Sequence, residues 1–315
     1  MSFDIREIVL QLVYATEALL MLTGNVIIMV AIVVRQKLTK KEFWLPFGLA
    51  VAEFIYGCGI FGVGVRRTQL TLEQRIHEIV TRWDCIKEPR TVPFIIGGYF
   101  IPTMLLLISL DRFIACSSIR FYQRLNVRVV ATFTILGMLL SLGLTFGSVL
   151  ATYMEPVQAN ITRHCLGPLV MIPSVTKFWQ FYQGFGSLVS VLIYGAALVV
   201  LRHSSDNTSL SSNLKQIKLR QAKVTRTLSV VLLCCLLLYT IPHFTLLFGK
   251  YFVSGATLRI MVPVAIFVAN LNSANNVVIY WMKNEELREA IKSLFKGKKV
   301  YPKISSANWN NWKSK

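Results

Sequence analysis

The sequence predicts an all-α membrane protein: a bundle of seven transmembrane helices followed by a short amphipathic eighth helix. Three observations support this fold class. Hydrophobic residues make up 54% of the 315 residues and charged residues only 16%, whereas a soluble domain carries about 25% charged residues. Seven apolar runs each reach the length of about 20 residues that a bilayer span requires. After the seventh run, apolar residues recur at helical spacing within a charged segment.

The seven runs have the composition of membrane helices. Glycine and proline occur inside several of them, which membrane helices tolerate, and none alternates polar and apolar residues like a barrel strand. We find no internal repeat of the inverted kind that many transporters contain. The first run has no basic segment before it and no clear cleavage site, so we expect a retained signal-anchor helix. The runs cover residues 8–34, 43–65, 91–117, 127–153, 178–201, 227–249 and 257–281.

The segment after the seventh run, WMKNEELREAIKSLFKGKK, predicts the eighth helix. Leu287, Ile291, Leu294 and Phe295 share one side of a helix and the charged residues share the other, which is typical of a helix lying on the inner leaflet. We therefore expect one seven-transmembrane domain over residues 1–296, including this helix. Residues 297–315 then form a basic, disordered cytoplasmic tail.

The positive charges predict how the chain sits in the plasma membrane. With the N-terminus outside and the C-terminus cytoplasmic, the inner segments hold 23 of the 34 lysines and arginines: four in 35–42, four in 112–128, six in 202–226 and nine in 283–315. Lysine and arginine favour the cytoplasmic side. The net charge of +19 then predicts attraction of the inner segments to an anionic inner leaflet. Nucleic acid is not expected as a partner, because no basic domain with interspersed aromatic residues is present.

Two of the six cysteines fall outside the spans on the predicted extracellular side. Cys85 precedes the third run and Cys165 follows the fourth, and disulfides persist in that compartment. A bond between them would fix the second outer loop to the start of helix three. The sequon NIT makes Asn160, in the same loop, a candidate glycosylation site.

Several polar residues interrupt the apolar runs, where an isolated charge costs at least about 2.5–3.5 kcal/mol. If their helices are neighbours, these side chains can satisfy one another as an intramembrane network. Hydrogen bonding that serves only helix packing is the alternative for any single asparagine. For Glu17, in the first run, both interpretations stay open. The candidate network comprises Asn25, Glu53, Asn272, Ser273 and Asn276.

Five features occur in a fixed order along the seven runs. They are Asn25 after Gly24, LAVAE in the second run, DRF at 111–113, the Cys85 and Cys165 pair, and NSANNVVIY at 272–280. Together they resemble the rhodopsin-like (class A) G-protein-coupled receptors over nearly the whole chain. The resemblance implies that Asp111, Arg112 and Phe113 close helix three at the cytoplasmic face. Arg112 would pair with Asp111 at rest and move toward Tyr194 and Tyr280 on activation.

The chain also departs from the common class A pattern. Glu53 replaces the usual aspartate, and its extra methylene reduces the room at the sodium site known in that family. Gly186 stands where helix five usually has proline, Thr240 stands where helix six usually has tryptophan, and Val277 replaces the proline of helix seven. This divergence, with a short N-terminus and compact loops, is most similar to nematode serpentine chemoreceptors, the Srsx group in particular.

The resemblance implies an extracellular ligand and excludes two classes. An opsin needs a Schiff-base lysine in helix seven, and that run has none before Lys283. An amine receptor of this family would carry an acid in the outer part of helix three, where this chain has Phe94. A small molecule and a peptide both stay open, and so does simple packing for the aromatic residues. The candidate pocket residues are Phe94, Tyr99, Phe178, Trp179, Tyr182, His243 and Phe244.

A heterotrimeric G protein is the partner that the resemblance implies on the inner side. The basic segment before the sixth run is expected to extend helix six beside Arg112, and such a groove suits a terminal helix of a G protein. We expect contacts from Arg112, Tyr122, Lys223 and Arg226.

Other functions have less support. An enzyme is not expected, because the four histidines are scattered and no phosphate loop or nucleophile elbow occurs. No metal or cofactor is expected. The alternatives are a transporter or channel that uses Glu53 as an ion or proton relay, and a receptor-like scaffold that does not signal.

Overall fold

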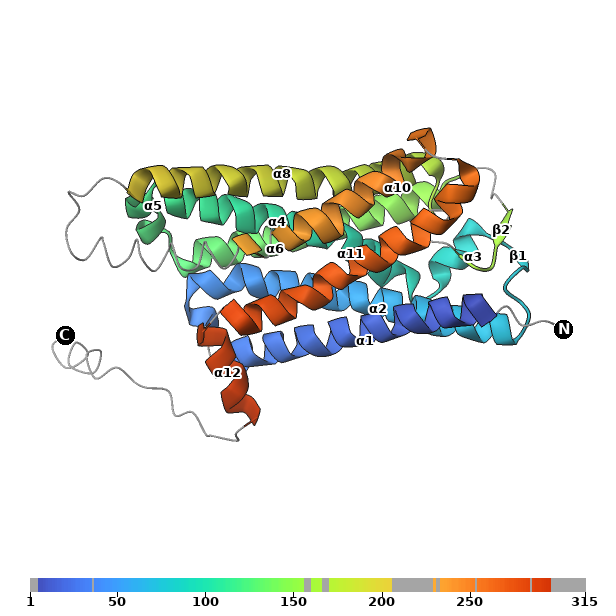
Figure 1. Cartoon of the computed structure of the whole chain (residues 1–315), viewed down its shortest axis with the longest axis horizontal. Coiled ribbons are helices and arrows are strands. Elements are labelled where there is room, and N and C mark those ends of the chain that lie inside the picture. Colours follow the sequence, from blue (N-terminus) through green and yellow to red (C-terminus); the bar gives the residue numbers. More distant parts are fainter. Residues whose placement is uncertain are drawn as a thin grey trace.

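The computed structural model describes residues 5–35, 37–155, 160–165, 170–205, 229–230, 233–252, 254–283 and 285–295, and these are almost entirely helical (Figure 1). The long helices are α1 (Ile5–Val34), α2 (Trp44–Leu72), α4 (Thr91–Ser117), α6 (Val127–Tyr153), α8 (Pro173–Ser205), α10 (Ile241–Phe252) and α11 (Gly255–Lys283). The short elements are the 3₁₀ turns η1 (Lys37–Thr39) and η2 (Lys41–Phe43), the helices α3 (Arg82–Lys87), α5 (Ile119–Arg124) and α12 (Glu285–Phe295), the π turn η3 (Leu236–Thr240), and the strands β1 (Ile79–Thr81) and β2 (Asn160–Thr162).

Within the described part of the chain, α1, α2, α4, α6 and α8 are long and apolar enough to cross a membrane. Two shorter apolar stretches follow, Leu233–Gly249 and Met261–Ser273. The bounds of α4 and α6 coincide with the predicted runs 91–117 and 127–153. α6 turns large apolar side chains outward, including Phe133 and Phe146, which is unfavourable against water and suits contact with lipid.

The largest difference from a predicted bound, within the described residues, lies at the end of α2. The second run was expected to end at residue 65, but α2 continues to Leu72 and includes Arg66 and Arg67. The continuation contains no glycine or proline after Gly64 to stop it. Arg67 is 6% exposed, because it turns toward the loop around Cys165 and not into solvent.

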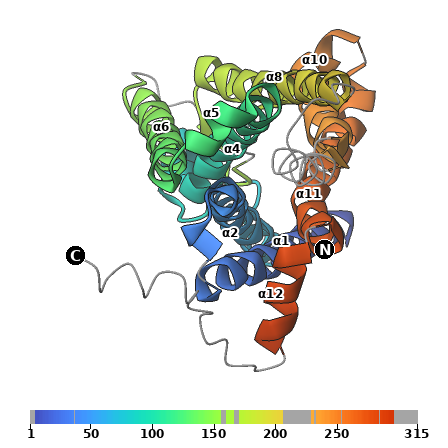
Figure 2. The same cartoon turned by 90° about the vertical axis from the view of Figure 1, so that its left-hand side faces the viewer.

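α4 is the central helix of the bundle. It packs against α2, α6 and α8, while α1 packs against α2 and α11, and α10 bridges α8 and α11 (Figure 2). Figure 2 views the bundle from the end that carries α5 and α12. α12 leaves the bundle at a steep angle beside the end of α1 (Figure 1). Close helix contact depends on small residues: a Cβ at Gly59 of α2 would lie 2.5 Å from the backbone nitrogen of Phe94 in α4.

A small cap covers the opposite end of the bundle and was not predicted from the sequence. β1 and β2 pair antiparallel, with Val80 opposite Ile161, and α3 follows β1 directly. Thr81 caps α3 by accepting a hydrogen bond from the backbone of Asp84, whose carboxylate accepts one from the backbone of Thr81. This arrangement fixes the start of α3, which contains Cys85.

Candidate functional site

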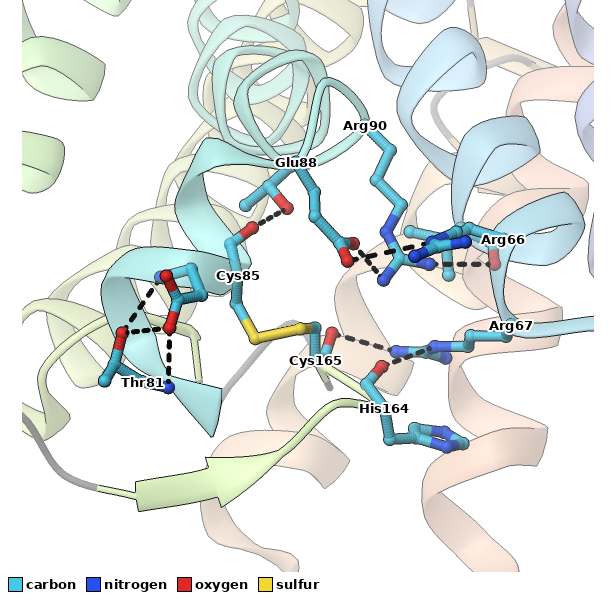
Figure 3. The surroundings of a disulfide bond; sticks show 11 residues. Arg66, Arg67, Thr81, Cys85, Glu88, Arg90, His164 and Cys165 are labelled. Atoms are coloured by element: carbon cyan, nitrogen blue, oxygen red, sulfur yellow. Dashed lines mark hydrogen bonds and ion pairs between the residues drawn. A yellow bond between two sulfur atoms is a disulfide. The ribbon is translucent and has the colours of Figure 1, made fainter. Parts of the chain in front are cut away.

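The predicted disulfide between Cys85 and Cys165 is present and joins α3 to the loop after β2, 80 residues further along the chain. Arg67 connects α2 to the same loop (Figure 3). Its Nε donates to the carbonyl of His164 at 3.0 Å and its Nη2 to the carbonyl of Cys165 at 3.1 Å. The cap is therefore held by one covalent bond and by a buried guanidinium. We call this end of the bundle the disulfide end.

Charged residues surround the disulfide. Arg90 pairs with Glu88, and Arg66 lies 3.9 Å from the same carboxylate (Figure 3). The side chain of His164 lies among positive groups, and burial together with Arg67, Arg90 and His77 lowers its pKa to about 3. His164 is therefore neutral at physiological pH.

A cavity of about 530 Å³ opens at the disulfide end, beside His164 and Cys165. Its walls come from α1, α2, α4, α8, α10 and α11, and most of the lining side chains are apolar. This volume lies within the range of about 300–1,000 Å³ that is typical of small-molecule sites. In the described part of the chain, no aspartate or glutamate lines the cavity. Its basic residues are Arg67, His77, His164 and His243.

Three of the seven predicted pocket residues line this cavity: Phe94, Trp179 and His243. The rings of Phe94 and Trp179 lie 5.3 Å apart, and Phe94 stacks on Tyr56 at the same separation. These aromatic side chains bring α2, α4 and α8 together on one wall.

The other predicted pocket residues do not line the cavity. Tyr99 is fully buried and its hydroxyl lies 2.7 Å from that of Ser148 in α6. Tyr182 lies 2.8 Å from Thr103 through its hydroxyl. Phe178 is 47% exposed on the outer surface of α8. These three rings form a contact group between α4, α6 and α8. Phe244 stacks on Phe248.

Several lining residues were not predicted from the sequence, notably Gln183, Tyr56 and Tyr14. The signal for Gln183 was present, because it lies one helical turn after Trp179 and therefore on the same face of α8. Tyr14 and Tyr56 gave no such signal, since nothing in the sequence tells which face of α1 or α2 meets the cavity.

At the far end of α4, the residues of the DRF motif form a compact group. Arg112 is 3% exposed. Its Nε donates to the carboxylate of Asp111 at 2.8 Å, and its Nη2 donates to Asp111 and, at 2.9 Å, to the hydroxyl of Tyr122. Lys41 lies over the Tyr122 ring, 3.9 Å from its centroid. We call this group, Asp111, Arg112, Tyr122 and Lys41, the Arg112 cluster.

Among the remaining predicted switch residues, the structure describes the side chains of Tyr194 and Phe113 but not that of Tyr280. Tyr194 is 1% exposed in α8, and Phe113 is half-buried beside Arg112. The backbone of Tyr280 lies in α11, but its side chain is outside the described part of the structure, as are the side chains of Asn276 and Asn160. Lys223 and Arg226 also lie outside the described residues.

Thr240 stands where class A receptors usually carry a tryptophan in helix six, and it makes a hydrogen bond to α8. Thr240 ends the π turn η3 and is 2% exposed. Its hydroxyl donates to the hydroxyl of Ser187 in α8 at 3.0 Å. π turns often mark functional positions in helices, and this one ends two residues before Pro242.

The intramembrane polar residues are deeply buried. Glu53, Asn25, Asn272 and Ser273 are each at most 2% exposed. Asn25 donates to the carbonyl of Met21, one turn earlier in its own helix, at 2.9 Å. A second pair joins α1 to α11, since Asn270 donates to the carboxylate of Glu17 at 3.4 Å.

Comparison with known proteins places this architecture in a family. The model of the serpentine type 7TM GPCR chemoreceptor Srsx family matches residues 18–295. Similar relatives include trace amine-associated receptor 6 of Homo sapiens, 23% identical over 322 residues, which is 96% of this chain and 89% of the relative. Trace amine-associated receptor 7f of Mus musculus is 22% identical over 320 residues, which is 96% of this chain and 86% of that relative.

Proposed function

The chain belongs to the Srsx family of serpentine G-protein-coupled chemoreceptors, and from this membership we propose that it binds a small extracellular ligand in the cavity at the disulfide end. It is a multi-pass membrane receptor and not an enzyme. In the proposed mechanism, ligand binding changes the partners of Arg112 and opens a site for a heterotrimeric G protein.

One observation carries this proposal. The cavity and the Arg112 cluster lie at opposite ends of one helix, α4, which supplies Phe94 to the first and Arg112 to the second. At 1.5 Å per residue, these residues are about 27 Å apart along the helix. α4 is packed on three sides by α2, α6 and α8. A shift of such a rigid element links two distant sites when both sites favour one of its positions.

The cavity favours a small molecule over a peptide, since the cap covers one side of it and its volume suits a compact ligand. The relatives are named for trace amines. We do not transfer that ligand, because a protonated amine calls for a carboxylate partner and none is found among the described lining residues.

The topology and contacts that go with this function are also proposals. We infer seven spans, an outside N-terminus, a cytoplasmic C-terminus, and α12 as a helix on the inner leaflet before a basic tail over 297–315. The domain then covers residues 1–296. Asn160 is the proposed glycosylation site. The proposed switch combines Asp111, Arg112, Phe113, Tyr194 and Tyr280, and the proposed G-protein contacts are Arg112, Tyr122, Lys223 and Arg226.

Nucleotide exchange on a G protein tests this function. The full chain would be expressed in cells with a G protein of broad receptor specificity and exposed to a panel of small metabolites, with surface expression measured in parallel. We expect at least one ligand to stimulate exchange in the wild type and not in Arg112→Ala. Ion flux that persists in Arg112→Ala and disappears in Glu53→Gln would instead support a transporter. Ligand binding without exchange on any G protein would support a non-signalling scaffold.

A further inference from the structure

We propose that Trp179 and Gln183 form the hydrogen-bonding subsite of the cavity, and that this subsite binds an acceptor oxygen of a carboxylate or carboxamide ligand. The inference rests on the proposed function, since it names the ligand chemistry of the same cavity. It goes further by assigning which atoms recognise the ligand and which ligand class they reject.

Both side chains are buried and both have unused hydrogen-bonding atoms. Gln183 is 1% exposed and Trp179 is 5% exposed. Among the described residues, neither the indole Nε1 of Trp179 nor the Nε2 and Oε1 of Gln183 has a hydrogen-bond partner. Buried polar groups are almost always paired in folded proteins. Both residues line the cavity and their unpaired atoms are closed to solvent, so a rotation of the two side chains would bring these atoms to a ligand.

Gly98 of α4 brings the two donors together. A Cβ at residue 98 would clash with the Nε2 of Gln183 and would lie 2.6 Å from the Nε1 of Trp179. Both nitrogens lie within 2.6 Å of the position of that Cβ, so the two nitrogens are at most about 5 Å apart. An oxygen can then lie about 2.9 Å from each nitrogen and accept a hydrogen bond from both. A larger residue at position 98 would fill the space that the two side chains occupy.

The chemistry of the two groups selects an oxygen ligand. Indole is only a donor, and a glutamine amide offers two donors and one acceptor. A carboxylate or carboxamide oxygen accepts from both donors, whereas an ammonium group can bind only the Oε1 of Gln183 and leaves both donors unpaired. The surroundings agree with this selection, since the guanidinium of Arg67 and no described carboxylate line the cavity.

Three probes with one apolar body test the subsite: 3-phenylpropanoate, 3-phenylpropanamide and 3-phenylpropylamine. Their affinities would be measured by calorimetry on the purified full chain in nanodiscs, without a G protein. We expect the acid and the amide to bind at least tenfold more tightly than the amine. Gln183→Met should weaken the acid and amide about tenfold, the effect of one lost hydrogen bond to a buried partner. Gln123→Met, at an exposed glutamine of α5 at the opposite end of the bundle, should change all three affinities less than threefold.

Trp179→Phe is the second variant, because it keeps a ring on the wall and removes only the donor; it should also weaken the acid and the amide. If the acid binds more tightly than the amide, the carboxylate is the recognised group, and the reverse order assigns the carboxamide. An amine that binds as tightly as the acid overturns the inference, as does the absence of binding by all three probes at millimolar concentration. Unchanged acid and amide affinities in both variants would overturn it too.

The signalling proposal has a separate readout. Binding of the acid without nucleotide exchange contradicts G-protein activation and leaves the subsite intact. Exchange that is driven by the amine, and lost in Glu17→Gln, overturns the subsite and leaves the receptor function intact.

Discussion

The guanidinium of Arg112 donates a 2.9 Å hydrogen bond to the hydroxyl of Tyr122, which lies on the short helix α5. Arg112 is also bound to the adjacent Asp111, so it joins a residue of its own helix to a residue of α5. In the proposed mechanism these bonds belong to the resting state, and the bond to Tyr122 is the one that a movement of α4 relative to α5 can break.

Tyr122→Phe should therefore raise basal signalling. The variant keeps the ring under Lys41 and removes only the hydroxyl. Losing this hydrogen bond should destabilise the resting state by about 1 kcal/mol, which would raise the active population about fivefold. The measurement is nucleotide exchange without ligand. Phe121→Leu is the matched control, since Phe121 is 54% exposed on the same short helix. A basal rate equal to that of the wild type would show that this bond does not restrain Arg112.

The disulfide should contribute strongly to the stability of the cap. Replacing Cys85 and Cys165 together by serine removes a bond that closes an 80-residue separation, and losing a native disulfide costs about 2–5 kcal/mol in small domains. We expect a lower melting temperature in detergent and weaker ligand binding. Cys58→Ser is the control, because Cys58 is a half-buried free thiol in α2. Equal melting temperatures for the two variants would contradict this prediction.

The contact between α2 and α4 should depend on Gly59. A methyl group there would meet the backbone of Phe94 at 2.5 Å, and backbone cannot move aside as a side chain can. Gly59→Ala should destabilise the protein by about 1–3 kcal/mol. Gly143→Ala on α6 is the control, since a Cβ at that position meets nothing within 4 Å, and alanine favours a helix over glycine by about 1 kcal/mol. Opposite shifts in melting temperature are therefore expected, and equal shifts would refute the close packing.

The acid sensitivity of the cap should depend on His164. Its pKa is lowered to about 3 by burial and by Arg67, Arg90 and His77, against about 6.5 in an unfolded chain. Between these values the unfolded state binds the extra proton, so stability falls as the pH decreases from about 6.5 toward 3. His164→Gln should reduce the difference between the melting temperatures at pH 7.5 and pH 4.5. His203→Gln, at an exposed site in α8, should leave that difference unchanged; an identical pH dependence in wild type and His164→Gln would contradict the prediction.

The long helices could be predicted from the sequence, because an uninterrupted apolar run fixes both the type and the length of a span. For α4 and α6 the predicted and observed bounds agree. The pairing of Cys85 with Cys165 could also be predicted, since both cysteines lie outside the spans on the same predicted side. The β1–β2 ribbon could not, because its strands have three residues each and leave no recognisable alternation.

The residues that line the cavity were hard to predict, mainly because the sequence does not fix how each helix is rotated about its axis. Tyr99 and Trp179 are both aromatic residues near the disulfide end, yet Tyr99 faces Ser148 in α6 and Trp179 faces the cavity. A uniformly apolar helix carries little periodicity to tell its lipid face from its inner face. The contact of Thr240 with Ser187 was missed for a related reason: the sequence showed the loss of a tryptophan but not which residue would meet its replacement.

Gln183 should lower the stability of the receptor when no ligand is bound. Because the amide of Gln183 is buried and without a partner among the described residues, Gln183→Met should remove the desolvation cost of that amide and keep the volume of the side chain. An unsatisfied buried polar group costs about 1–3 kcal/mol, so the melting temperature of the ligand-free variant should rise. Gln180→Met should have a smaller effect, since Gln180 is only half-buried. A ligand that occupies the subsite should reverse the order, because it stabilises the wild type more than the variant. A ligand-free variant that melts below the wild type would show that Gln183 already has a partner.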